Sequence, residues 1–234
     1  MTVKLWAVVP AAGSSRRMVG AALPKQYLQL AGRSVIEWAL APFLDHPGCE
    51  RVVVVLAEQD RRWTELSIAG NPKILTATGG AERADSVRAG LRALAPQATE
   101  RDWVLVHDAA RPCLRAADLN RLIAELGDDS VGGLLAAPVV DTLKRADAGD
   151  RVQETVSRAS LWRALTPQMF RYAVLDRALR AAHDSHSTPT DEAQAVEALG
   201  LHPRLVPGDP DNIKITLPED VERAARLLKS WSVA

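Results

Sequence analysis

The feature that most constrains the fold is a run of five apolar residues, Val52 to Leu56, with no polar residue among them. Alternate side chains of a strand point to opposite sides of its sheet, so a strand that is apolar throughout buries both faces. Such strands belong to parallel sheets that carry helices on either side. The run therefore predicts an α/β protein.

Other short apolar runs alternate with helical patterns along the chain. The predicted strands are Leu5–Val9, Arg51–Leu56, Lys73–Thr76, Trp103–Val106, Gly133–Ala137, Arg204–Val206 and Ile213–Ile215. The first predicted helix begins at the capping-box sequence Ser34 to Glu37, and two more cover Arg83–Leu94 and Ala116–Leu126. The last predicted helix begins at a second capping box, Thr216 to Glu219, and reaches about Leu228. This order predicts a single doubly wound, mostly parallel sheet.

One segment, at about residues 139–158, interrupts this alternation. Two strand-like pieces, Asp141–Lys144 and Val152–Thr155, flank the polar turn from Ala146 to Asp150. This pattern predicts a β-hairpin, either as an arm that leaves the main sheet or as an ordinary surface excursion. The chain is therefore expected to form one domain, residues 1–234, with an arm subdomain at about 139–158.

Charge and cysteine content exclude several classes of protein. The 29 basic residues balance the 29 acidic ones, whereas a binder of duplex nucleic acid usually has a basic excess. The two cysteines form no Cys-x-x-Cys pair, which argues against a zinc ribbon or a disulfide framework. No run reaches the roughly 18 apolar residues of a membrane span. We expect a soluble, cytoplasmic protein with neither a nucleic-acid nor a membrane partner.

The loop after the first predicted strand has the composition of a phosphate-binding turn. Its small residues allow backbone N–H groups to approach an anion closely, and they are Pro10, Ala11, Ala12, Gly13, Ser14 and Ser15. Arg17 and Lys25 add positive charge to the same region. The loop matches neither Gly-x-Gly-x-x-Gly nor the P-loop pattern. On its own it is also compatible with a small-residue turn beside solvated basic side chains.

These residues resemble the start of the nucleotidyltransferases that load a sugar or polyol phosphate with a nucleotide. Pro-Ala-Ala-Gly at residue 10, Arg-Met at 17 and Pro-Lys-Gln-Tyr at 24 are similar to the 2-C-methyl-D-erythritol 4-phosphate cytidylyltransferase family of the non-mevalonate isoprenoid pathway. Further matching segments follow in family order: Gly79 to Val87, Val106 to Pro112, Asp141 to Lys144, Thr155 to Arg158, Leu165 to Gln168, Thr190 to Ala193 and Asp211 to Thr216. The departures are Ser15, Ala81 and one extra residue between Arg17 and Lys25.

The resemblance implies a Rossmann-like nucleotidyltransferase fold and transfer of CMP from CTP to 2-C-methyl-D-erythritol 4-phosphate. The products are 4-diphosphocytidyl-2-C-methyl-D-erythritol and pyrophosphate. The nucleophile is a phosphate monoester with a second pKa near ~6, so it is already largely ionised at pH 7 and needs no general base. Positioning and charge stabilisation therefore carry the catalysis.

The resemblance also assigns roles to individual residues. The catalytic cations are Arg17, Lys25 and Lys214. The residues expected to bind CTP are Pro10, Ala11, Ala12, Gly13, Ser14, Ser15, Arg17, Lys25, Gly79, Gly80, Arg83, Ser86, Asp108 and Ala109. The residues expected to bind the acceptor are Asp108, Arg111, Thr142, Arg158, Thr166, Thr190 and Lys214.

Asp108 is the expected partner of a ribose hydroxyl or the ligand of Mg²⁺ or another divalent cation, since one carboxylate plus substrate phosphates suffices for magnesium. A structural pair of Asp108 with Arg111 is the alternative, compatible with that role. In the family the arm reaches across a homodimer, so that Thr142 and Arg158 serve the partner's active site.

Two other functions remain open at this stage. A ribitol 5-phosphate cytidylyltransferase would share the fold and most motifs and differ in the acceptor. A nucleotide-binding regulatory module without catalysis would belong to another class, but it predicts loss of Arg17, Lys25 and Lys214, all of which are present.

Overall fold

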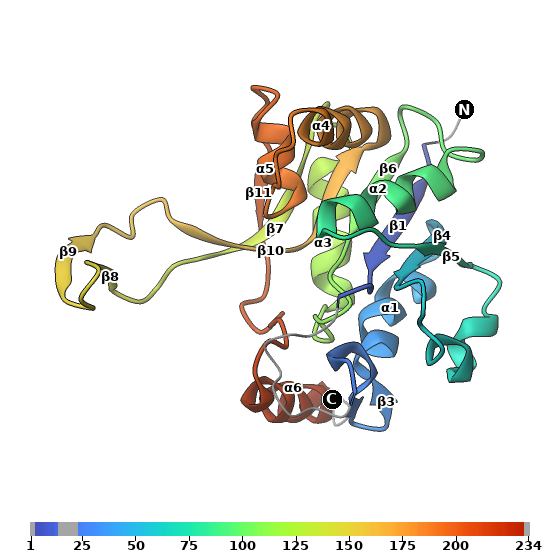
Figure 1. Ribbon diagram of the computed structural model, residues 1–234, viewed down its shortest axis with the longest axis horizontal. Coiled ribbons are helices and arrows are strands. Elements are labelled where there is room, and N and C mark those ends of the chain that lie inside the picture. Colours follow the sequence, from blue (N-terminus) through green and yellow to red (C-terminus); the bar gives the residue numbers. More distant parts are fainter. Residues whose placement is uncertain (1–2, 14–22, 232–234) are drawn as a thin grey trace.

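A seven-stranded sheet forms the centre of the molecule, with strand order β11-β7-β10-β6-β1-β4-β5. The computed structural model describes residues 3–13 and 23–231 (Figure 1). The strands of the sheet are β1 (Leu5–Pro10), β4 (Cys49–Leu56), β5 (Ile74–Thr78), β6 (Trp103–Val106), β7 (Gly132–Pro138), β10 (Trp162–Arg171) and β11 (Arg204–Pro207). Every pairing is parallel except those of β10 with β6 and β7. The predicted mostly parallel α/β sheet is confirmed.

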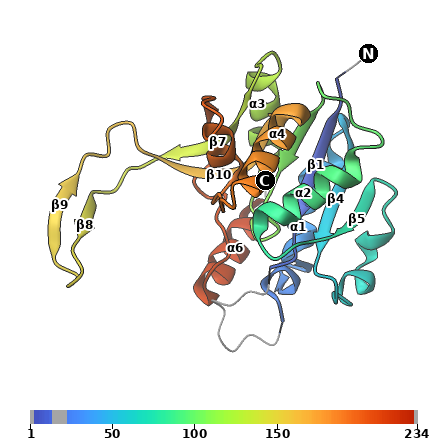
Figure 2. The ribbon, with the colours of Figure 1, turned by 45° about the horizontal axis from the view of Figure 1, so that its top comes forward.

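Helices cover both faces of this sheet (Figure 2). They are α1 (Val35–Asp45), α2 (Arg83–Leu94), α3 (Ala116–Leu126), α4 (Tyr172–Asp184), α5 (Glu192–Glu197) and α6 (Pro218–Trp231). Short elements complete the fold: the 3-10 turns Lys25–Tyr27, Trp63–Glu65 and Ser67–Gly70, and the two-stranded pair β2 (Gln29–Leu30) and β3 (Arg33–Ser34). No helix in the described ranges is long and apolar enough to cross a bilayer.

The apolar run that opened the sequence analysis lies in β4 and is fully buried. Val52 and Val54 pack in one cluster with residues of α1 and α3, whereas Val53 and Val55 pack in a second cluster with residues of α2, α4 and α5. All four valines have no exposed surface. The uninterrupted apolar pattern is thus explained by burial of both faces of the strand.

Two helix starts were predicted from capping boxes, with different outcomes. At α1 the Ser34 side chain accepts from the Glu37 N–H, and the Glu37 carboxylate accepts from the Ser34 N–H, as predicted. At α6 the carboxylate that accepts from the Thr216 and Leu217 N–H groups belongs to Asp220, not to the expected Glu219. The helix therefore starts at Pro218, close to the predicted place, with a different capping acid.

The prediction of a strand over Ile213–Ile215 was wrong. These residues form an extended segment that crosses the loop after β6, where the Ile215 N–H donates to the Ala110 carbonyl. Ile213 and Ile215 are buried against Ala224 and Leu228 of α6, so their apolar alternation serves a small separate core. Strand β10, which the sequence analysis did not predict, lies between β6 and β7.

The predicted hairpin is present. Strands β8 (Leu143–Ala146) and β9 (Val152–Val156) pair antiparallel and form a two-stranded sheet of their own. Figures 1 and 2 both show this hairpin extending well away from the body of the molecule on two long connections. It therefore has the shape of an arm, while its role in dimerisation stays a prediction.

Candidate functional site

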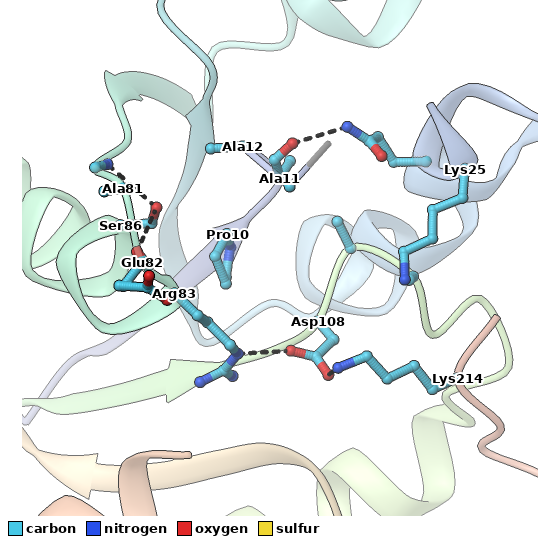
Figure 3. A pocket seen from close by; sticks show the side chains of 15 residues that line it. Pro10, Ala11, Ala12, Lys25, Ala81, Glu82, Arg83, Ser86, Asp108 and Lys214 are labelled. Atoms are coloured by element: carbon cyan, nitrogen blue, oxygen red, sulfur yellow. Dashed lines mark hydrogen bonds and ion pairs between the residues drawn. The ribbon is translucent and has the colours of Figure 1, made fainter. Parts of the chain in front are cut away.

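A pocket opens beyond the carboxyl ends of β1 and β6, next to the start of α2 (Figure 3). Its lining consists of Pro10, Ala11, Ala12, Gly13, Lys25, Gln26, Gly80, Ala81, Glu82, Arg83, Ser86, Asp108, Ala109, Ala110 and Lys214. The chain passes from β1 through α1 to β4 on one side, and after β5 it returns through α2 to β6 on the other side of β1. Ligands of open α/β sheets bind at such a switch point.

Two loops of small residues form one wall of the pocket. The Ala11 N–H donates to the Val55 carbonyl, and the buried Gln26 side chain donates to the Ala11 carbonyl, which together fix the first loop. Gly79 lies so close to this loop that a Cβ there would fall 2.7 Å from the Ala12 Cβ. Glycine at position 79 is therefore required for the two loops to touch.

Asp108 is the electrostatic centre of the pocket. Its Oδ1 lies 3.0 Å from the Arg83 Nε, and its Oδ2 lies 2.8 Å from the Lys214 Nζ and 3.6 Å from the Arg111 Nε. Burial alone would raise the pKa of this carboxyl, but Arg83, Lys214 and Arg111 outweigh it and hold the pKa well below its ordinary value. The carboxylate stays charged at any physiological pH.

Lys25 and Lys214, which lie 189 positions apart in the sequence, line the same pocket. The Lys25 Nζ donates to the Ile215 carbonyl over 3.0 Å, one residue beyond Lys214. In Figure 3 both side chains point into the pocket toward Asp108. Three predicted residues, Ser14, Ser15 and the third cation Arg17, lie outside the described residues.

The predicted acceptor residues separate into two groups. Arg111 and Thr166 lie beside Asp108: the Thr166 Oγ1 accepts from the Asp108 N–H, and Arg111 forms the ion pair described above. Thr190 immediately precedes Asp191, the N-cap residue of α5. Thr142 and Arg158 are exposed on the arm, where Arg158 donates to the Val140 carbonyl, so within one copy of the chain they do not join the pocket.

Two residues beside the pocket were missed by the sequence analysis. Glu192 is 1% exposed, and its carboxylate binds Arg83 through two hydrogen bonds of 2.5 and 3.0 Å. Burial raises the pKa of Glu192 against the opposing effect of Arg83. The motif Thr190 to Ala193 marked this segment, but nothing in the sequence indicated that its glutamate meets an arginine 109 positions away.

The second missed residue is His107. Its Nδ1 lies 2.9 Å from the Thr166 Oγ1 and its Nε2 lies 3.0 Å from the Arg111 carbonyl. A carbonyl only accepts, so Nε2 carries the proton and Nδ1 accepts from the threonine hydroxyl. Burial lowers the pKa of His107 to about 4, which keeps the ring neutral. The histidine therefore orients Thr166 and the loop around Asp108.

The donor set around Asp108 is compatible with a divalent cation. Among residues 3–13 and 23–231 no cluster of three or more His, Cys, Asp or Glu side chains could hold a metal. Magnesium is commonly held by one or two carboxylates and completed by substrate phosphates, so Asp108 suffices. Its Oδ2 pairs with the Lys214 ammonium over 2.8 Å, and both residues line the pocket.

Solved structures with the same fold define the class of this protein. It is similar to a crystal structure of 4-diphosphocytidyl-2C-methyl-D-erythritol synthase, with a TM-score of 0.85 and 39% identity, over 97% of this chain and 100% of the other. It is also similar to the Francisella tularensis 2-C-methyl-D-erythritol 4-phosphate cytidylyltransferase, with a TM-score of 0.83 and 31% identity, over 96% and 99% of the two chains. The fold is that of a nucleotidyltransferase.

The sequence comparisons identify the family. The family model for 2-C-methyl-D-erythritol 4-phosphate cytidylyltransferase matches residues 5–230. The chain is 56% identical to the enzyme of that name from Ectopseudomonas mendocina over 99% of this chain and 97% of the other, and 55% identical to that from Pseudomonas putida over 93% and 92%. The chain therefore belongs to the 2-C-methyl-D-erythritol 4-phosphate cytidylyltransferase family, and the predicted cytidylyltransferase activity in isoprenoid biosynthesis is confirmed.

Proposed function

We propose that the pocket around Asp108 binds CTP and 2-C-methyl-D-erythritol 4-phosphate together, and that Arg17, Lys25 and Lys214 neutralise their phosphates during CMP transfer. The observation that carries the proposal is the meeting of Lys25 and Lys214 in one pocket at the edge where β1 and β6 end. A phosphate oxygen of the acceptor attacks the α-phosphorus, and pyrophosphate leaves.

This chemistry needs charge and position more than proton transfer. The acceptor phosphate is already ionised at neutral pH, so the barrier comes from bringing two polyanions together. Lys25 and Lys214 supply preorganised positive charge, a contribution typically worth about 2.7–4 kcal/mol for each donor to a developing anion. The small residues Ala11 to Gly13 leave their backbone accessible for the nucleotide.

The nucleotide occupies the half of the pocket formed by the first loop and the start of α2. Ser86 donates its hydroxyl to the Glu82 carbonyl and accepts from the Gly80 N–H, which shapes the loop beside the base. Gly79 and Gly80 keep this wall thin, as a site for a pyrimidine requires. Arg83, Asp108 and Ala109 line the ribose and phosphate side.

Asp108 would hold Mg²⁺, or another divalent cation in its place, together with the substrate phosphates. When bound, the cation withdraws charge from the phosphoryl oxygens. Asp108 is prepared for this role because its neighbouring cations keep it ionised. Lys214, whose Nζ lies 2.8 Å from Oδ2, would turn toward the phosphates when the substrates bind.

The working unit that we propose is a homodimer joined through the arm at about residues 139–158. A two-stranded hairpin is marginally stable by itself, and this one extends from the body with exposed apolar side chains on or next to it, namely Val140, Val152, Leu161 and Trp162. A partner that covers them would bring Thr142 and Arg158 to the neighbouring pocket, where Arg111, Thr166 and Thr190 would complete the acceptor site.

We further propose a cytoplasmic location. Cys49 and Cys113 are both buried free thiols, which agrees with a reducing compartment.

The experiment that tests this function is release of pyrophosphate from CTP and Mg²⁺ with each polyol phosphate supplied separately. We expect turnover with 2-C-methyl-D-erythritol 4-phosphate and little with ribitol 5-phosphate. Turnover with ribitol 5-phosphate alone would contradict the proposed acceptor, and turnover with neither would contradict the proposed function.

A further inference from the structure

Glu192 is a buried carboxylate that lies beside the pocket without lining it, and its pair with Arg83 opposes the rise in pKa that burial causes. It is the first residue of α5 and directly follows Asp191, whose side chain caps that helix. Its carboxylate lies against the Arg83 guanidinium, with Oε1 2.5 Å from Nη1 and Oε2 3.0 Å from Nη2. A two-bond pair of this kind fixes the orientation of an arginine as well as its position.

The orientation of Arg83 determines which of its nitrogens contacts Asp108 and which Asp108 oxygen it occupies. With both terminal nitrogens bound to Glu192, the Nε is the nitrogen that faces Asp108, over 3.0 Å at Oδ1. The other oxygen, Oδ2, pairs with Lys214 over 2.8 Å and lies 3.6 Å from the Arg111 Nε, with no contact to Arg83. Burial opposes the charge of Arg83, but Glu192 and Asp108 outweigh it and hold the pKa of Arg83 above its ordinary value.

We propose that Glu192 is a positioning residue, which holds both terminal nitrogens of Arg83 so that Asp108 keeps Oδ2 for Lys214 and the substrates. The inference deepens the proposed function and rests on it. Glu192 also follows Thr190, whereas Arg83 follows the Gly79–Gly80 loop, so the pair ties the acceptor side of the pocket to the nucleotide side.

Removal of the charge at position 192 has a specific expected effect. In Glu192→Gln one oxygen remains to accept from Arg83, but the negative charge that holds the guanidinium is gone. Asp108 would then be the remaining carboxylate in contact with Arg83. Arg83 would turn a terminal N–H toward Asp108 and compete with Lys214 for Oδ2. Asp108 would become less available to a cation or a ribose hydroxyl.

The test combines Glu192→Gln with Arg83→Met in a double-mutant cycle. We expect Glu192→Gln to lower kcat/KM by about 10- to 100-fold in the natural background, the size of effect that misplaced reacting groups produce. In the Arg83→Met background the same change should alter kcat/KM by less than about threefold, because Glu192 then has no arginine to hold. Calorimetric affinity for CTP with Mg²⁺ should follow the same pattern.

Asp102→Asn provides a matched control. Asp102 is a buried carboxylate, 2% exposed, that lies at the opposite end of β6 from Asp108 and accepts from the Lys4 N–H and the Trp6 indole. Its substitution should lower the melting temperature and leave kcat/KM and CTP affinity unchanged. Comparison of the two variants thus distinguishes a loss of stability, expected in both, from a loss of Arg83 positioning, expected only in Glu192→Gln.

Two results would overturn the inference: natural kcat/KM and CTP affinity in Glu192→Gln, or an equal loss in both backgrounds. If Glu192→Gln does not fold, kcat/KM and CTP affinity of the double variant, which lacks both buried charges, are compared with those of Arg83→Met alone. A difference of more than about threefold would then overturn the inference. If the natural protein shows no cytidylyl transfer, the proposed function fails, and the CTP affinities of the four proteins still decide the role of Glu192.

Discussion

At the scale of single residues, the pocket is built for charge and not for proton transfer. His107 is the histidine beside the pocket, and both of its ring nitrogens are engaged by Thr166 and the Arg111 carbonyl. Its pKa of about 4 leaves it neutral and a weak base at physiological pH. The charged residues that line the pocket are instead Lys25, Glu82, Arg83, Asp108 and Lys214.

Substitution of Lys25 tests this assignment. We expect Lys25→Ala to lower turnover by at least about 100-fold, the scale of a lost donor to a developing anion, with an unchanged circular dichroism spectrum. Lys73→Ala is the matched control, because the Lys73 Nζ also binds main-chain carbonyls, those of Leu44 and His46, outside the pocket. Equal turnover in the two variants would remove Lys25 from the mechanism.

The depressed pKa of His107 predicts how stability depends on pH. A folded-state pKa of about 4, against an ordinary value of 6.5, means that folding favours the neutral ring. Its contribution, about 3 kcal/mol, is complete above pH 6.5 and is lost as the pH falls from 6.5 to 4. Denaturant unfolding across this range should show a smaller loss in His107→Gln, which keeps a donor near the Arg111 carbonyl. Parallel curves for both proteins would contradict the assignment.

The sequence predicted the residues that face the pocket better than those that hold them in place. Lys25, Lys214, Asp108 and the glycine loop belong to motifs that can be matched along the chain. Glu192 and His107 act through partners far away in sequence, so their roles became visible only after folding brought them together.

At the scale of helices and strands, the sequence predicted a strand correctly where its apolar pattern matched its burial in the fold. Strand β4 was predicted because its burial on both faces appears directly in its apolar run. Strand β10 was missed because it contains Pro167 and the buried polar residues Thr166 and Gln168, which are satisfied by tertiary partners. The Ile213–Ile215 segment had strand-like alternation but no neighbouring strand edge.

The capping box of α1 provides a test of local stability. Ser34 has no exposed surface and caps the helix through the Glu37 N–H. We expect Ser34→Ala to lower the free energy of unfolding by about 1 kcal/mol, measured by urea denaturation. Activity at a temperature below the transition should not change, because α1 contributes no residue to the pocket lining. A loss of kcat in the folded variant would contradict this separation.

The arm predicts a specific kinetic effect. Arg158 is exposed on the connection that follows β9 and does not line the pocket of its own chain. We expect Arg158→Ala to raise the KM for the polyol phosphate far more than the KM for CTP, because its proposed contact is with the acceptor. Steady-state kinetics with each substrate varied in turn measures the two constants. Equal changes in both would count against that contact.

At the scale of the whole molecule, the proposed dimer can be tested by mixing two impaired variants at a polyol phosphate concentration well below the KM of Arg158→Ala. Lys25→Ala damages the pocket, and Arg158→Ala damages the arm. If arms serve partner pockets, half of the dimers in an equal mixture are hybrids with one intact site each, and about a quarter of natural activity should return. If the arm serves its own chain, mixing should restore nothing. Light scattering of each variant checks that both remain dimers.

The central claim is that Lys25 and Lys214, distant in sequence, meet at one pocket to hold a triphosphate. A crystal structure with CTP and Mg²⁺ tests it most directly. We expect the triphosphate against the backbone of Ala11 to Gly13, with the ammonium groups of both lysines within hydrogen-bonding distance of phosphate oxygens. A triphosphate bound elsewhere, or in contact with neither lysine, would contradict the account.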